Sequence, residues 1–195
     1  MTPRASAPDV SARDGSGNPA RMEIPGFGTF ADPDDLGWHV GEQEVTVPGL
    51  RGARGRFVLV GLDDDASVAP PALLDAMRAF LAMGSGTADE AAPHVHAYYR
   101  DMLDLDMGWD AYVPGDVPVD RIWDHVRVGD EFMVAFERLP GGGEDAFVSI
   151  ESGCDWEPEH GLMLSFRGGD RLARVGPYDG GVVNADPAVV YAGLA

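Results

Sequence analysis

The sequence predicts an α+β fold in which two or three helices pack on a mainly antiparallel sheet. Three observations support this class. Short β-rich segments fill residues 24–61, two helical patterns follow within residues 71–103, and alternating strands occupy residues 131–175. Strands, then helices, then strands are typical of helices gathered on one face of a sheet.

The N-terminal strands are predicted from four short segments rich in aromatic and β-branched residues. These segments span residues 27–30, 37–40, 44–47 and 56–60. Aspartate, proline and glycine between them supply turn chemistry, so each segment is bounded like a strand.

Two helices and a short third one are predicted next. In residues 71–83, Leu74, Met77, Phe80 and Leu81 recur at three- and four-residue spacing. A second helix begins with a possible capping box at Thr87, and Pro93 either kinks it or marks its real start. Its apolar stripe is formed by Val95, Tyr98, Tyr99, Met102 and Leu103. A short helix after Asp120 completes the set.

The last third predicts a meander of strands at residues 131–137, 146–151, 160–166 and 172–175. Gly168 and Gly169 form a strong two-residue hairpin turn between the last two strands. A short terminal helix is predicted to start near Asn184 or Asp186, each close to Pro187.

The composition predicts a soluble cytoplasmic protein. The chain has 195 residues, 45% of them hydrophobic and 24% charged, and a single cysteine, Cys154. No apolar run is long enough to span a membrane. Residues 1–21 are expected to be a disordered tail and residues 22–195 a single domain. Translation from Met1 and from Met22 both fit this boundary.

The charge balance points away from nucleic acid and membranes. There are 33 acidic residues against 14 basic ones, which gives a net charge of −19. Such a chain repels phosphates and anionic lipids, and it attracts basic partners. All 14 basic residues are arginine, so a P-loop lysine and a Schiff-base lysine are excluded.

The densest polar cluster is the loop at residues 151–161. A metal site would use Asp155, Glu159 and His160, with Cys154 as an alternative third ligand. Adjacent residues of a strand point to opposite faces, so Glu159 and His160 converge only if the loop bends. The structural interpretation is a wide hairpin loop in which Trp156 covers the core edge. Carboxylates near Cys154 are expected to raise its pKa, which disfavours a thiol nucleophile.

Several segments resemble an uncharacterised bacterial family of unknown function. The resemblance rests on a closing motif, Trp-Glu-Pro-Glu-His-Gly-Leu, at residues 156–162, and on the opening Ile-Pro-Gly-Phe-Gly-Thr-Phe at 24–30. Residues 175–180 and the helix containing Tyr98 and Tyr99 add to it. The resemblance covers most of residues 22–186 and implies no activity, cofactor or catalytic residue.

Two function hypotheses follow. The first is an interaction module that binds a basic protein through an acidic face, in one version as an immunity-type inhibitor of a basic toxin. Its expected partner-binding residues are Trp109, Asp110, Asp155, Trp156, Glu157 and Glu159. The alternative is a metal-dependent hydrolase that uses Asp155, Glu159 and His160. The first hypothesis needs no cofactor.

Overall fold

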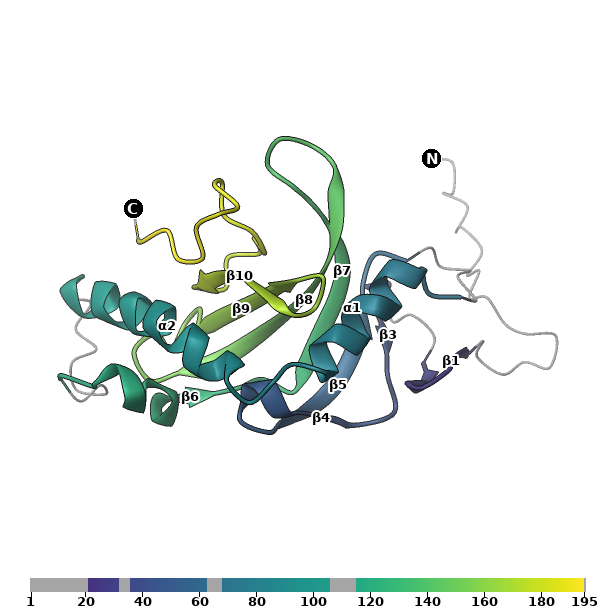
Figure 1. The fold of residues 1–195 in the computed structure, drawn as a ribbon, viewed down its shortest axis with the longest axis horizontal. Helices are drawn as coiled ribbons and strands as arrows, with labels where there is room; N and C mark the ends of the chain where they lie inside the picture. Colours follow the sequence, from purple (N-terminus) through teal and green to yellow (C-terminus); the bar gives the residue numbers. More distant parts are fainter. Residues whose placement is uncertain (1–20, 32–35, 63–67, 106–114, 195) are drawn as a thin grey trace, which may run out of the picture.

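The computed structural model describes residues 21–31, 36–62, 68–105 and 115–194. Its elements are laid out in Figure 1. The strands are β1 (Met22–Ile24), β2 (Gly28–Phe30), β3 (His39–Val40), β4 (Val45–Val47), β5 (Ala53–Leu59), β6 (Val126–Arg127), β7 (Glu131–Arg138), β8 (Glu144–Cys154), β9 (Leu162–Arg167) and β10 (Arg171–Gly176). The helices are η1 (Pro48–Leu50), α1 (Pro71–Leu81), α2 (Thr87–Asp104) and η2 (Val119–His125).

The main sheet is mixed and mostly antiparallel, which confirms the predicted fold class. Its strand order is β10-β9-β8-β7-β5-β3, with β4 paired to β5 and β6 paired to β8. Strands β7 to β10 form the predicted C-terminal meander through consecutive hairpins. The β5–β7 pair is parallel, so the chain needs a long crossover between them, and this crossover contains α1, α2 and η2.

The core lies between one face of this sheet and the two α-helices (Figure 1). Phe57, Phe80 and Phe132 pack in edge-on and tilted arrangements with ring centroids 5.2 to 6.0 Å apart. The predicted face of α1 is partly wrong, since Leu73 is buried where Leu74 is only half-buried. Met77 and Phe80 are buried as predicted, whereas Leu73 and Ala76 complete the buried face in place of the half-buried Leu74 and Leu81.

Helix α2 continues through Pro93. Its buried stripe contains the predicted Val95, Tyr98, Tyr99 and Met102, so the stripe is confirmed. The short predicted helix is present as η2, where Trp123 Nε1 donates to the Ala88 carbonyl of α2 over 2.8 Å.

The predicted terminal helix is wrong: residues 177–194 contain no helix. The Asp186 side chain accepts from the Ala188 amide over 2.9 Å, and Asn184 Nδ2 donates to the carbonyls of Val189 and Val190. These local bonds form turns that compete with a helical first turn. None of the helices in the described ranges is long and apolar enough to cross a bilayer.

The second face of the sheet carries the alternate residues of the strands. On β8, Val148 and Ile150 enter the main core, whereas Phe147 and Ser149 point to the other side. The C-terminal segment crosses the β9–β10 end of this face, where Ser165 Oγ donates to the Val182 carbonyl. The opposite end of this face remains open and forms the groove described next.

Candidate functional site

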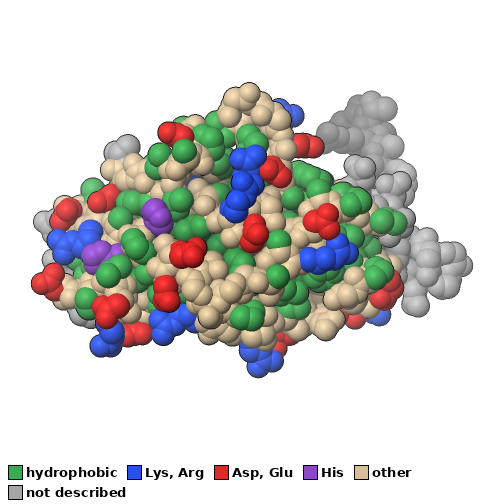
Figure 2. All heavy atoms as spheres, viewed as in Figure 1, with side chains coloured by type: hydrophobic (Ala, Val, Ile, Leu, Met, Phe, Trp, Pro, Cys, Tyr) green, Lys and Arg blue, Asp and Glu red, His purple; other side chains and the backbone are tan. Residues whose placement is uncertain are grey.

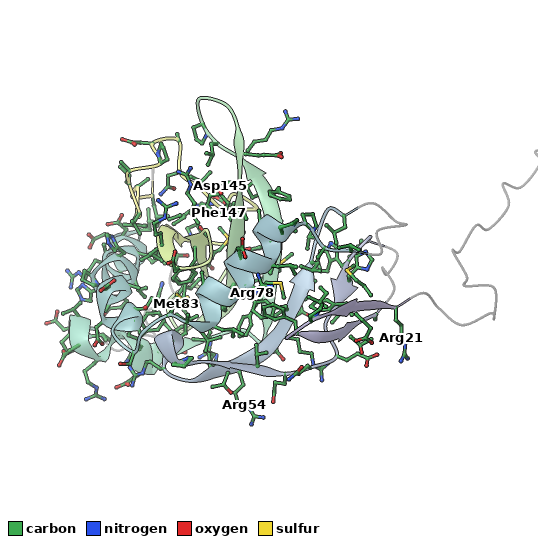
Figure 3. The ribbon with its side chains drawn as sticks, turned by 45° about the vertical axis from the view of Figure 1, so that its right-hand side comes forward. Arg21, Arg54, Arg78, Met83, Asp145 and Phe147 are labelled. Carbon is green, nitrogen blue, oxygen red and sulfur yellow. The ribbon has the colours of Figure 1, made fainter. Side chains whose placement is uncertain are left out.

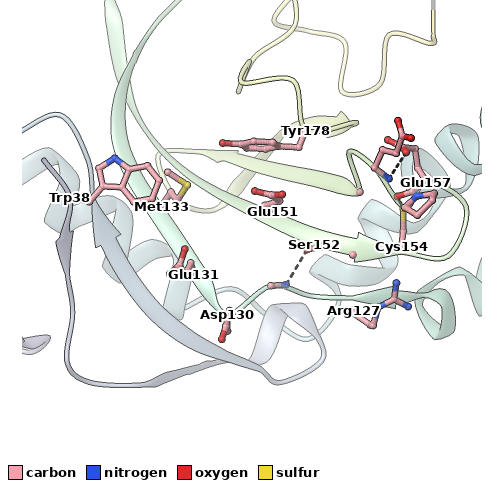
Figure 4. Close-up of a pocket in the computed structure, with 15 residues that line it drawn as sticks. Trp38, Arg127, Asp130, Glu131, Met133, Glu151, Ser152, Cys154, Glu157 and Tyr178 are labelled. Carbon is pink, nitrogen blue, oxygen red and sulfur yellow. Dashed lines mark hydrogen bonds between the residues drawn. The ribbon is translucent and has the colours of Figure 1, made fainter. Parts of the chain in front are cut away.

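A groove of about 410 Å³ lies on the second face, beside the end of β8 (Figure 4). Its lining combines aromatic, sulfur-containing and acidic residues from β6, β7, β8 and the loops around them. The lining residues are Trp38, Arg127, Gly129, Asp130, Glu131, Met133, Glu151, Ser152, Gly153, Cys154, Glu157, Pro158, Glu159, Gly161 and Tyr178. We call this feature the acidic groove.

Strand alternation places two carboxylates in the acidic groove. Phe132 pairs with Ile150 across β7 and β8, and both side chains are buried in the core. The neighbouring residues Glu131 and Glu151 therefore project from the opposite face, and both are exposed. Figure 4 shows them on the two adjacent strands, with Met133 of β7 close by.

Two aromatic side chains lie at the sides of the acidic groove. Trp38 precedes β3, which pairs with β5 at the sheet edge. Tyr178 follows β10, and its amide donates to the His160 carbonyl over 3.1 Å. Both side chains are half-buried. In Figure 4 the Tyr178 ring lies above Glu151, while Trp38 lies beside Met133.

Among the described residues, no arginine or histidine side chain forms an ion pair with Glu131 or Glu151. Most described arginines pair elsewhere with a carboxylate; Arg54 of β5, which is labelled in Figure 3, pairs with Glu44. Elsewhere on the surface, Figure 2 shows interspersed acidic and basic side chains on the side where α1 and α2 lie. The groove carboxylates are therefore available to a cation from outside.

Asp155, in the loop after β8, is neutralised by side chains of β6 and η2. Asp155 Oδ1 accepts from Arg127 over 2.5 Å, and its Oδ2 lies 3.1 Å from His125 Nδ1. The hydrogen bond from the Arg127 guanidinium is the main cause that lowers the pKa of Asp155, and His125 adds to it. This carboxylate thus fixes β6 to the end of β8.

Glu157 is a buried carboxylate that shapes the same loop, with a side chain 2% exposed. Its Oε1 accepts from the Glu159 amide over 2.9 Å, and its Oε2 accepts from the His160 amide over 2.8 Å. The same Oε2 lies 3.0 Å from His160 Nδ1, so that ring nitrogen carries the donated hydrogen. The imidazole itself is 60% exposed. Glu157 therefore holds the loop bend and orients His160.

Cys154 contributes no nucleophile to the acidic groove. The thiol is buried, and burial raises its pKa to about 12; the nearby Glu157 carboxylate adds to the rise. The predicted direction is confirmed, but the main cause is burial, not neighbouring charge. A thiol with this pKa is protonated at neutral pH.

The predicted site residues separate in the structure. Trp156 is 1% exposed and packs edge-on against Tyr98 and Tyr99, with ring centroids 6.1 and 5.7 Å away, so it belongs to the core. Glu157 is buried, whereas Glu159 is exposed and lines the groove. Trp109 and Asp110 lie outside the described residues.

The proposed metal ligands do not gather in the described ranges. Within them, no three His, Cys, Asp or Glu side chains form a group able to hold a metal ion, and this includes Asp155, Glu159 and His160. Asp155 is instead engaged by Arg127 and His125. Among the residues that the structure describes, the geometry therefore gives the hydrolase alternative no ligand set.

The groove residues that sequence reasoning did not assign to a site include Trp38, Glu131, Glu151 and Tyr178. The available signal was strand alternation, which puts Glu131 and Glu151 opposite the buried Phe132 and Ile150. Trp38 and Tyr178 carried no such signal because their proximity depends on the crossover that joins β5 to β7.

Comparison with known proteins gives a family without an assigned activity. Residues 26–183 match the model of a domain of unknown function, DUF6985, in line with the predicted resemblance to a family of unknown function. No curated protein and no solved structure matches the chain. Since the match spans well over half of its length, the chain belongs to the DUF6985 family.

Proposed function

We propose that the protein is an interaction module that binds a basic protein segment in the acidic groove. The observation that carries this proposal is the pair of exposed strand carboxylates, Glu131 and Glu151, which have no cation partner among the described residues. The net charge of −19 supports it, because a strongly acidic protein attracts basic partners over a range set by the salt concentration.

The expected contribution of the two carboxylates is modest. An exposed ion pair is worth about 0.2–1 kcal/mol, so removing both charges weakens binding by about two- to thirty-fold. The aromatic side chains Trp38 and Tyr178 add apolar contact area beside the charges. Affinity therefore depends on both kinds of side chain, and the charged part weakens as salt rises.

The test uses an alternating Lys-Arg hexapeptide and isothermal titration calorimetry at about 50 and about 500 mM salt. We expect 1:1 binding that weakens with salt, and further weakening in the double variant Glu131→Gln/Glu151→Gln. The matched control is Glu90→Gln/Asp170→Asn, which removes two exposed charges outside the groove lining. Equal affinity for the two double variants would disprove groove binding.

An immunity-type inhibitor is the version of this proposal in which the basic partner is a toxin. Its support is the same charge complementarity, since occlusion of a basic active surface needs an acidic counterpart. Co-expression with a candidate toxin tests it. Survival that depends on Glu131 and Glu151, and not on the two control carboxylates, is the expected result.

A further inference from the structure

We infer that the acidic groove selects arginine over lysine, receiving one guanidinium between its aromatic sides and its two strand carboxylates. This inference rests on the proposed function and names the side chain that the partner supplies. It depends on four residues that line one groove: Trp38, Tyr178, Glu131 and Glu151. Figure 4 shows their arrangement around the ends of β7 and β8.

The two carboxylates suit a planar, forked donor. Glu131 and Glu151 each lie one position beyond the Phe132–Ile150 pair on strands about 4.8 Å apart, and both line the groove. Like charges on adjacent strand positions destabilise each other, and a shared cation removes that repulsion. A guanidinium presents five N–H donors in one plane and can serve two carboxylates at once.

The aromatic sides distinguish the two basic side chains. A guanidinium is flat and weakly hydrated, so it stacks on tryptophan and tyrosine rings while its edge donates hydrogen bonds. An ammonium group is compact and strongly hydrated, and it gains less from the same rings. Trp38 and Tyr178 are both half-buried, and both line the groove.

Internal cations do not occupy this position in the described part of the chain. Arg127 lines the groove, but its guanidinium binds Asp155. Arg174 binds Asp179 through both terminal nitrogens, at 2.7 and 2.6 Å. Both guanidinium groups are thus engaged with other carboxylates, and Arg56, the exposed Cα partner of Glu131 on β5, forms no ion pair with Glu131 among the described residues.

The experiment compares hexa-arginine, hexa-lysine and hexa-citrulline, which differ in side-chain shape and charge. Titration calorimetry of the full chain is expected to give at least five-fold tighter binding of hexa-arginine than of hexa-lysine, and no binding of neutral hexa-citrulline. In Trp38→Leu and in Tyr178→Leu, hexa-arginine falls to the hexa-lysine affinity, while hexa-lysine changes less than two-fold. Phe136→Leu, an exposed aromatic outside the groove lining, is the matched control and keeps the preference.

The outcomes separate the inference from the proposal on which it rests. If neither charged peptide binds, the proposed function fails and the inference fails with it. If both bind equally, the proposed function survives and arginine selection is wrong. A preference for arginine that persists in both Trp38→Leu and Tyr178→Leu also overturns the inference, since the groove then does not supply it. Circular dichroism confirms that each variant is folded.

Discussion

Glu157→Gln is expected to destabilise the fold by about 2–4 kcal/mol. The buried carboxylate accepts three hydrogen bonds, from the amides of Glu159 and His160 and from the His160 ring. Glutamine keeps one oxygen and turns an NH₂ group toward at least one of these donors. One or two bonds to a charged acceptor are lost at about 1.5–3 kcal/mol each, with partial relaxation of the loop.

Urea unfolding at neutral pH, followed by tryptophan fluorescence, measures this loss. A domain of this size has a free energy of unfolding of about 5–15 kcal/mol, so the variant still folds and its midpoint can be determined. Glu159→Gln is the matched control in the same loop, because Glu159 is exposed and only its backbone amide is engaged. A loss below about 0.5 kcal/mol for Glu157→Gln would refute the assigned role of this carboxylate.

Three further predictions address the turn, the thiol and the acid response. Gly169→Ala should destabilise the fold by more than about 2 kcal/mol in urea titrations, because φ at Gly169 is +90° and a Cβ there would lie 1.9 Å from the Ala76 carbonyl oxygen. Gly168→Ala is the matched control: φ is +64° but a Cβ would meet open space, so the loss should be only about 1–2 kcal/mol. Equal losses would contradict this contact. Cys154 should react with a disulfide reagent far more slowly in native than in urea-unfolded protein at about pH 8, since burial raises its pKa to about 12; similar rates would contradict its burial. The Arg167 guanidinium on β9 hydrogen-bonds Asp145 and lowers the pKa of that carboxyl below its unfolded value of about 3.9. The ion pair therefore stabilises the fold above that pH, and this stabilisation is lost as the pH falls through the folded pKa. Asp145→Asn should remove this part of the acid dependence of the urea midpoint, and an unchanged dependence would contradict the ion pair.

The strands and turns of the C-terminal half were predictable because their determinants are local. Leu162, Leu164 and Phe166 alternate on one face, and all three are buried in the structure. The Gly168-Gly169 turn has positive φ at both positions, as a two-residue hairpin turn requires. These features need only period-2 alternation and glycine, so no long-range information was required.

Three features were not predictable because they depend on competing or distant contacts. Pro93 favours a helix break, yet α2 continues through it with Ala92 and Val95 buried on either side. Asp186 is a good helix cap by type, but it forms a local turn instead. The parallel pairing of β5 with β7 brings Trp38, which precedes β3, next to the rest of the groove. This pairing depends on how the whole crossover packs, so no local sequence pattern predicts it.

The density of carboxylates in the sequence is a poor guide to available charge, because pairing and burial decide it. The richest cluster, residues 151–161, provides Asp155, which is neutralised by Arg127, and Glu157, which is buried in its own loop. The less conspicuous Glu131 remains exposed on β7, where alternation around a buried Phe132 forces it into the groove. A carboxylate held at a sheet surface without an internal cation repels its like-charged neighbour, and a basic ligand relieves that repulsion. The same strand register that builds the core therefore also creates the charge that a partner would bind.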